Sequence, residues 1–159
     1  MTTGEVKVRP ATRDDIPELV RLREVLADRM ADDAGHPADD AWQEPYAKSL
    51  HERLGDPDVA VLVIDGDRDG ELAACGIGFV FQRFPGPGRW DGRFGYILGM
   101  ATDPRHRRRG HGRAIMDALM LWYRDNGVTR VDLHATSDGE PLYRSMGFTQ
   151  PYPALTWFA

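Results

Sequence analysis

The chain has 159 residues, 42% of them hydrophobic and 28% charged, which predicts one domain spanning residues 1–159 with a core that needs no disulfide or metal. It contains no apolar run of about 18 residues and no signal-like leader, so we expect no membrane insertion and a cytoplasmic location. The net charge of -5 disfavours nucleic acid as the main partner, because Lys and Arg drive phosphate binding.

Hydrophobic spacing and turn residues predict an alternation of strands and helices along the whole chain. In chain order, we expect a strand at Val6 and Val8 that Pro10 ends, a helix from about 14 to 30, a helix over about 41–54, strands at 59–64 and 72–81, a strand at about 93–102, a helix through Ile115, Leu119 and Trp122 that ends near Gly127, a strand over 128–135, a short helix over 140–146, and a β-rich tail over 148–158.

The order of these elements predicts an α/β fold. Hairpin-paired strands come first, and a strand–helix–strand unit follows, which indicates a mixed sheet with a parallel pair around the helix at 110–125. The single Cys75 excludes an intrachain disulfide, and its apolar neighbours predict a small buried core residue.

The segment 105–113 carries five arginines and no acid, a local charge of +5, so the rest of the chain sums to -10. It lies between a predicted strand and a predicted helix, where free backbone N–H groups and the positive end of the helix dipole attract anions. Gly110 and Gly112 would let a phosphate approach the main chain. The pattern is neither a P-loop nor Gly-x-Gly-x-x-Gly, so these residues alone leave open which phosphorylated small molecule binds.

Two motifs resemble those of the GNAT superfamily of N-acetyltransferases. The segment 107–112, Arg-Arg-Arg-Gly-His-Gly, matches its Arg/Gln-x-x-Gly-x-Gly/Ala signature, and 142–148, Leu-Tyr-Arg-Ser-Met-Gly-Phe, is similar to its Leu-Tyr-x-x-x-Gly-Phe. The resemblance implies a mixed, mostly antiparallel sheet with a splayed parallel central strand pair, flanked by helices. It also implies acetyl-CoA as cosubstrate.

By this resemblance, the pantetheine arm of acetyl-CoA would lie along the main chain of the strand that ends at residue 102, and its pyrophosphate on the N–H groups of the basic turn. The implied cofactor-binding residues are Met100, Ala101, Thr102, Arg107, Arg108, Arg109, Gly110, His111, Gly112 and Arg113.

The resemblance also implies that Tyr143 is the general acid that protonates the leaving thiolate, since a phenol of pKa about 10 is protonated at pH 7. The expected reaction is direct attack of a primary amine on acetyl-CoA in a ternary complex, with a cationic small molecule as acceptor. A protein or peptide acetyltransferase, a non-catalytic coenzyme A sensor and a nucleic-acid binder are the alternatives.

A base would help to deprotonate the amine, and His134 at a strand end has a suitable intrinsic pKa. Glu24 and Asp28 on the first helix are weaker candidates. Two positions depart from the usual family pattern: Thr136 replaces an Asn that contacts the cofactor arm, and Gly139 replaces an Ala, which we expect to weaken the short helix by up to about 1 kcal/mol.

The acceptor pocket of the family is bordered by the first helices, and residues 14–56 hold twelve acids and five bases. Such an acidic rim would steer a cationic amine, although solubility explains it equally well. Aromatic residues that could line a pocket or fill the core are Trp42, Tyr46, Phe84, Trp90, Tyr152 and Trp157. The spacing of His36, His51, His106 and His111 predicts no metal site. Family members often dimerise, so a homodimer is possible.

Overall fold

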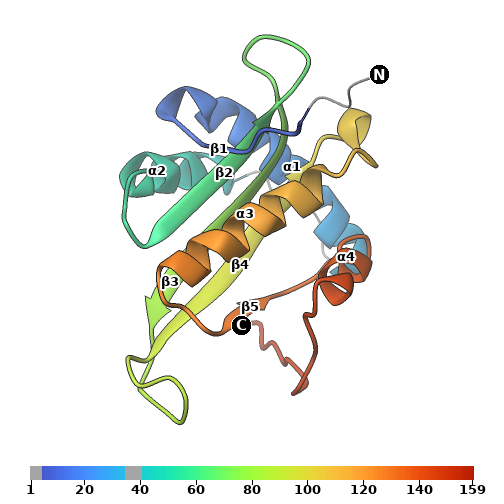
Figure 1. Cartoon of the computed structure of the whole chain (residues 1–159). Coiled ribbons are helices and arrows are strands. Elements are labelled where there is room, and N and C mark those ends of the chain that lie inside the picture. Colours follow the sequence, from blue (N-terminus) through green and yellow to red (C-terminus); the bar gives the residue numbers. More distant parts are fainter. Residues whose placement is uncertain (1–4, 35–40) are drawn as a thin grey trace.

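The computed structural model of the chain describes residues 5–34 and 41–159, without the side chains of 31–34. Figure 1 shows the elements along the chain. They are β1 (Arg9–Pro10), η1 (Arg13–Asp15), α1 (Ile16–Ala34), α2 (Gln43–Arg53), β2 (Val59–Asp65), β3 (Leu72–Gln82), β4 (Arg93–Thr102), η2 (Pro104–His106), α3 (His111–Asp125), β5 (Val131–Leu133) and α4 (Glu140–Ser145).

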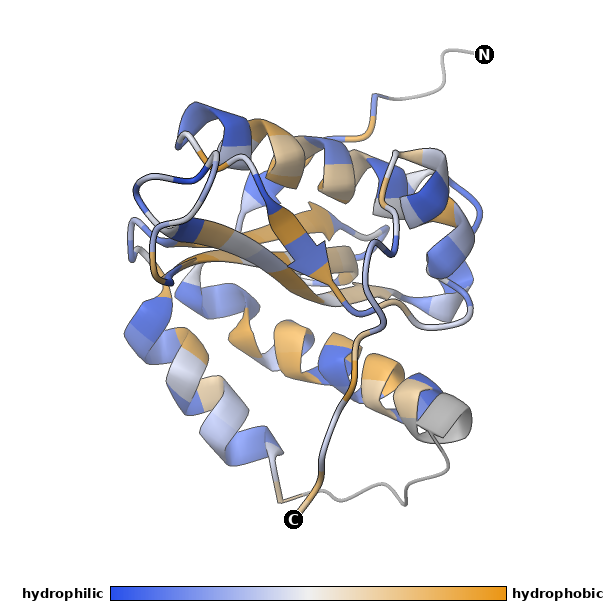
Figure 2. Cartoon of the chain, turned by 90° about the horizontal axis from the view of Figure 1, so that it is seen from below, coloured by the Kyte–Doolittle hydropathy of each residue, from blue (hydrophilic) through white to orange (hydrophobic). Residues whose placement is uncertain are grey.

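The strands form one five-stranded sheet in the order β1-β2-β3-β4-β5. The first four strands are antiparallel neighbours, and β5 runs parallel to β4. Helix α3 covers one face of the sheet, and α1 and α2 cover the other (Figures 1 and 2). The predicted mixed, mostly antiparallel α/β fold with one parallel pair is therefore confirmed.

Each face of the sheet has its own apolar core. On one side, Ile115, Met116 and Leu119 of α3 pack on the sheet; on the other, Leu19 and Leu22 of α1 do so, all of them fully buried. Burying a side chain of this size contributes roughly 1.5–3 kcal/mol, so these two helices fix the sheet between them.

Glycine in β4 lets α3 lie close to the sheet. A Cβ on Gly95 would lie 2.5 Å from Cε1 of Tyr123, so only glycine leaves room for that ring. The Tyr123 hydroxyl then donates to the carbonyl of Tyr96 at 2.7 Å, which satisfies its buried oxygen.

Cys75 is 2% exposed and packs with the α1 side of the core, which confirms its prediction as a core residue. Its Sγ donates to the carbonyl of Gly99 at 3.4 Å. Burial raises the pKa of this thiol to about 12.

The parallel pair opens toward the carboxyl end of β4. Only residues 95–97 of β4 pair with β5, whereas β4 stays paired with β3 as far as Thr102. The side of β4 that faces β5 therefore has no strand partner over residues 98–102 within the described chain. A sheet edge of this kind offers N–H and C=O groups to an added extended chain.

Two of the predicted strands have other bounds in the structure, and a third does not form. The first strand is Arg9–Pro10 instead of 6–8, because Val6 and Val8 pack on the α3-side core without pairing and Pro10 is tolerated in an edge strand. The strand predicted over 128–135 is shortened to β5, where the chain leaves β4.

The tail at 148–158 forms no strand in the described structure. Pro151 and Pro153 have no N–H to donate to a ladder, and Leu155 and Trp157 are 92% and 85% exposed. The parallel pair consequently lies at one edge of the described sheet and not at its centre. The tail instead passes from the α3 layer toward the α1 and α2 layer (Figure 2).

Candidate functional site

The basic turn begins at a buried aspartate at the end of β4. Asp103 is 2% exposed, its N–H donates to the carbonyl of Ala73, and its carboxylate accepts from the N–H of Arg105 at 2.9 Å. Pro104 follows it at the first position of η2, where a missing N–H costs nothing. The sequence Asp-Pro thus folds the chain sharply away from the sheet.

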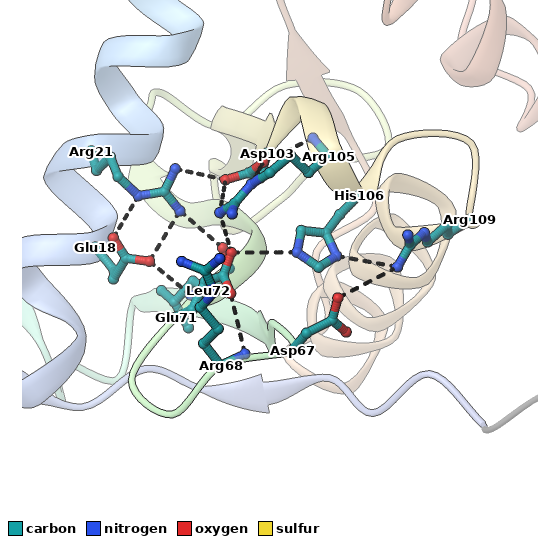
Figure 3. Close-up of polar contacts among 10 residues, drawn as sticks. All are labelled: Glu18, Arg21, Asp67, Arg68, Glu71, Leu72, Asp103, Arg105, His106 and Arg109. Carbon is teal, nitrogen blue, oxygen red and sulfur yellow. Dashed lines mark hydrogen bonds and ion pairs between the residues drawn. The ribbon is translucent and has the colours of Figure 1, made fainter.

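An ion-pair network holds this turn against α1 and the loop between β2 and β3 (Figure 3). Arg21 of α1 donates to Asp103 at 2.7 Å and to Glu18 at 2.5 Å. The carboxylate of Glu71 pairs with Arg105 and lies 3.5 Å from Nε2 of His106. Burial opposes ionisation of Asp103, but hydrogen bonds from Arg105 and Arg21 outweigh it and hold its pKa well below the usual value.

Two left-handed residues then lead into α3. Arg108 has a φ of 62° and Gly110, the N-cap of α3, a φ of 79°. A left-handed arginine is uncommon and marks a constrained turn. The turn formed by these residues ends at the positive end of the α3 dipole, where the first N–H groups of the helix have no intrahelical partner. The turn can therefore receive an anion.

A cavity of about 430 Å³ opens between this turn, the end of β4, α1 and α4. Nine of the ten residues predicted to bind the cofactor line it: Met100, Ala101, Thr102, Arg107, Arg108, Gly110, His111, Gly112 and Arg113. Arg109 is the exception. Its guanidinium lies 3.5 Å from Nδ1 of His106 and 4.0 Å from Asp67, on the side of the turn held by the network. The Arg109 side chain thus contacts the network that holds the turn, and its part in cofactor binding stays a prediction.

His111 has an unsatisfied nitrogen beside this cavity. Its Nδ1 is buried and has no hydrogen-bond partner among the described residues. Burial, together with the charges of His106 and Arg109, lowers the pKa of the ring. A neutral imidazole with a free nitrogen can bond a ligand that enters here.

Tyr143, on α4, is 8% exposed, and burial raises the pKa of its phenol. The protonated form is therefore favoured even more than usual at neutral pH. Gly139 precedes α4 as its N-cap and lies against the Tyr143 ring. Because Gly139 precedes the helix interior, the interior cost of glycine relative to alanine that we expected does not apply to it.

A second cavity, of about 730 Å³, lies between the ends of β3 to β5, α4 and the tail. Among the described residues, Tyr143 is the one that lines both cavities. Its side chain therefore forms part of the wall of each.

The candidate base His134 lines the second cavity and is paired with a tyrosine. Its Nδ1 lies 2.7 Å from the hydroxyl of Tyr96 on β4. Desolvation, with the nearby charge of Asp132, raises the pKa of Tyr96, so this phenol stays protonated. The other two candidates line neither cavity: Glu24 is bonded to Gln43, and Asp28 is exposed.

The aromatic residues that could line a pocket or fill the core do not gather at one place. Of the six, Tyr152 alone lines one of the two cavities described above, the second one. Phe84, Trp90 and Trp157 are exposed, and Tyr46 packs on the α1-side core beside Trp42. The acidic residues at 39 and 40 and His36 lie outside the described residues. Within the described part of the chain, no three His, Cys, Asp or Glu side chains gather as a metal site.

Several lining residues were not predicted. Val25, Leu26 and Arg29 of α1 wall the first cavity, and Arg29 pairs with Asp138 before α4. Their helical spacing marks a core-facing stripe, which carries no sign of a ligand. Thr136, at the position of the usual family Asn, also lines this cavity and keeps a hydroxyl there.

Comparison with known proteins shows which family and which solved structures the chain resembles. The model of the acetyltransferase (GNAT) family matches residues 23–148. A GCN5-related N-acetyltransferase from Ralstonia eutropha JMP134 is 30% identical with a TM-score of 0.79, over 97% of this chain and 99% of that one. No curated protein matches the chain.

Two further solved structures share the fold. A predicted acetyltransferase from Clostridium acetobutylicum, solved with acetyl-CoA, is 22% identical with a TM-score of 0.79, over 96% of both chains. Glucosamine-6-phosphate N-acetyltransferase from Arabidopsis thaliana is 20% identical with a TM-score of 0.75, over 97% of this chain and 98% of that one. No helix within residues 5–34 and 41–159 has the length and apolar character needed to cross a bilayer.

Proposed function

The chain belongs to the GNAT family of acetyltransferases, and from this premise we propose that it moves the acetyl group of acetyl-CoA to a primary amine of a small molecule, by direct attack in a ternary complex. One observation carries the proposal: two cavities, one beside the basic turn and one beside His134, meet at Tyr143. Two substrates held in these cavities would bring their reacting ends together at the phenol.

The residues around the first cavity suit acetyl-CoA. Arg107, Arg108 and Arg113 line it and can pair with phosphate oxygens, beside the N–H groups that begin α3. The unpaired side of β4 over residues 98–102 can bond the amide groups of the pantetheine arm. The free Nδ1 of His111 supports a ligand here, because an unsatisfied buried nitrogen costs about 1–3 kcal/mol when the site is empty.

The transfer forms a bond from the amine nitrogen to the thioester carbon and breaks the bond from that carbon to sulfur. The departing thiolate takes the proton of the Tyr143 hydroxyl, which its raised pKa keeps in place until the bond breaks. A backbone N–H of β4 beyond Leu98 can stabilise the charge that develops on the carbonyl oxygen.

The amine must lose a proton, and His134, which lines the second cavity, would take it. When Nδ1–H of His134 donates to Tyr96, Nε2 is free to accept the proton from the attacking amine. Tyr96 then fixes the orientation of the ring. This pair gives His134 its proposed role as general base.

Replacing Tyr143 by Phe tests the proposal. We expect kcat to fall by about 100- to 10,000-fold, the usual contribution of a positioned acid, while the Kd of acetyl-CoA stays within about twofold. The hydroxyl has no hydrogen-bond partner among the described residues, so the fold should be unaffected. Wild-type turnover of the variant would refute the role of Tyr143, and a wild-type protein that binds acetyl-CoA but acetylates no amine would indicate a sensor.

The acceptor class, a homodimer and a cytoplasmic location remain predictions from the sequence. The acidic excess that favoured a cationic acceptor lies partly in residues that the structure does not describe. The charged residues that line the second cavity all belong to the described part of the chain, and they would contact an acceptor bound there.

A further inference from the structure

We infer that the second cavity selects amines that also carry an anionic group, a carboxylate or a phosphate, and that Arg83 binds this group. The inference rests on the proposed function, which places the acceptor in this cavity. It refines the expected cationic acceptor to a molecule that bears both charges.

The charged side chains that line the cavity do not balance. Three are arginines, Arg83, Arg130 and Arg144, and two are acids, Asp132 and Glu140. Each acid already has a partner. Arg130 donates to Asp132 at 3.2 Å, and Arg144 donates to Glu140 at 2.8 Å. Arg83 has no carboxylate within 4.0 Å among the described side chains, so it is the cation of this cavity left for a ligand.

Arg83 also stands in a cluster of like charges. The guanidinium carbons of Arg83, Arg89 and Arg130 lie 4.9, 5.2 and 5.4 Å from the centre of the Phe94 ring. Of these three, only Arg130 has a carboxylate partner in the described structure. The ring attracts each cation but does not neutralise it. The charges of Arg83 and Arg89 therefore lie near the same Phe94 ring without a carboxylate partner, although the chain as a whole has a net charge of -5.

The aromatic side chains hold the Arg83 guanidinium ready for an anion. It lies over Phe94 and, at 5.4 Å, over Phe81, which packs tilted against Phe94 with ring centres 6.0 Å apart. These ring contacts occupy none of the guanidinium N–H groups with a carboxylate, so a planar carboxylate or a phosphate can accept from them. Because the group is already oriented, binding costs less side-chain entropy.

The position of Arg83 fits one end of an elongated acceptor. Arg83 follows the last residue of β3, whereas His134 follows β5 and Tyr143 lies on α4. An acceptor bound by its anionic group at Arg83 could present its amine to His134 and Tyr143.

Matched acceptors test the inference. We would measure kcat/KM for acetylation, and calorimetric Kd in the presence of coenzyme A, for 6-aminohexanoate against hexylamine and for 6-aminohexyl phosphate against 6-aminohexan-1-ol. We expect the anionic member of at least one pair to be preferred by about tenfold or more, and Arg83→Gln to remove about 10- to 100-fold of kcat/KM for that member only. The pair that shows the preference identifies carboxylate or phosphate.

Arg89→Gln is the matched control, since Arg89 contacts the same Phe94 ring but does not line the cavity. We expect it to change the preference by less than about threefold, because it loses only a screened charge. Acetylation without preference for either anionic member, or an Arg83→Gln loss equal for both members of a pair, would overturn the inference and leave the proposed function standing. Absence of acetylation with every amine would overturn the proposed function, while a calorimetric preference that Arg83→Gln removes would still support the anion site.

Discussion

Gly139 controls where the Tyr143 hydroxyl lies, and Gly139→Ala tests this directly. A Cβ at residue 139 would lie 2.9 Å from Cε2 of Tyr143 and 3.2 Å from its hydroxyl oxygen. Carbon atoms in contact prefer about 3.5–4.0 Å, so the ring must retreat by about 0.6 Å or more. Gly139 has a φ of -85°, which alanine adopts freely, so the effect comes from the ring and not from backbone strain.

A displacement of this size has a measurable cost. A misplacement of 1 Å near the reacting atoms can cost about 100-fold, so about 0.6 Å predicts a fall in kcat of about tenfold. Overpacking should lower the free energy of unfolding by about 1–3 kcal/mol. Steady-state release of coenzyme A and urea unfolding measure the two effects. Gly86→Ala is the control, because a Cβ there meets nothing within 4 Å, and both quantities should stay at wild-type values.

The effect of Gly139→Ala must also depend on the hydroxyl that it displaces. In a Tyr143→Phe background the general acid is absent, so Gly139→Ala should lower kcat by less than about twofold further. A double-mutant cycle for kcat measures this coupling. An equal, tenfold fall in both backgrounds would refute the reasoning, because the methyl group would then be acting on something other than the phenol.

Three further outcomes are expected. Arg107→Gln should weaken coenzyme A binding about tenfold, whereas Arg109→Gln should leave the calorimetric Kd nearly unchanged. Equal losses would contradict the view that Arg107 faces the cofactor and Arg109 does not. Acetyl-CoA at about 100 times its Kd should raise the free energy of unfolding by about 2.7 kcal/mol, and an unchanged Tm would count against the first cavity as its site. Asp103→Asn should remove about 1.5–3 kcal/mol of stability at neutral pH, because Arg21 and Arg105 keep Glu18 and Glu71 as partners. Because folding lowers the pKa of Asp103, its contribution is complete above the usual aspartate pKa of about 3.9 and disappears as the pH falls below it, so wild type and variant should converge in acid.

The parts of the site that the sequence predicts are those fixed by local geometry. Asp-Pro favours a turn through local geometry, and Gly110 permits a left-handed residue before a helix, so the turn could be predicted from neighbouring residues. The direction in which each arginine side chain points could not be predicted in this way. Arg109 turns away from the cavity because Asp67 and His106 lie on its other side, and Asp67 comes from a loop some forty residues earlier in the chain.

The second cavity depends almost wholly on contacts between distant segments. Tyr96 and His134 are paired only because β4 and β5 are parallel neighbours in that register, and nothing near either residue marks the contact. At the tail, by contrast, the sequence predicted a strand that does not form in the described structure. Its apolar and aromatic residues have the composition of a strand, but the two prolines deny it a continuous ladder, and it lies exposed beside the cavity.

The buried position of Cys75 determines how the folded protein behaves in assays that use thiol-reactive dyes. The chain has one cysteine, and only a thiolate reacts readily, so a thiol whose pKa burial raises to about 12 is silent toward thiol-reactive dyes in the folded state. The dye will therefore report coenzyme A released by turnover without interference from the enzyme. With no substrate present, the slow rate at which the dye labels Cys75 instead measures how often the sheet and α1 separate. This rate gives the free energy of that opening under native conditions.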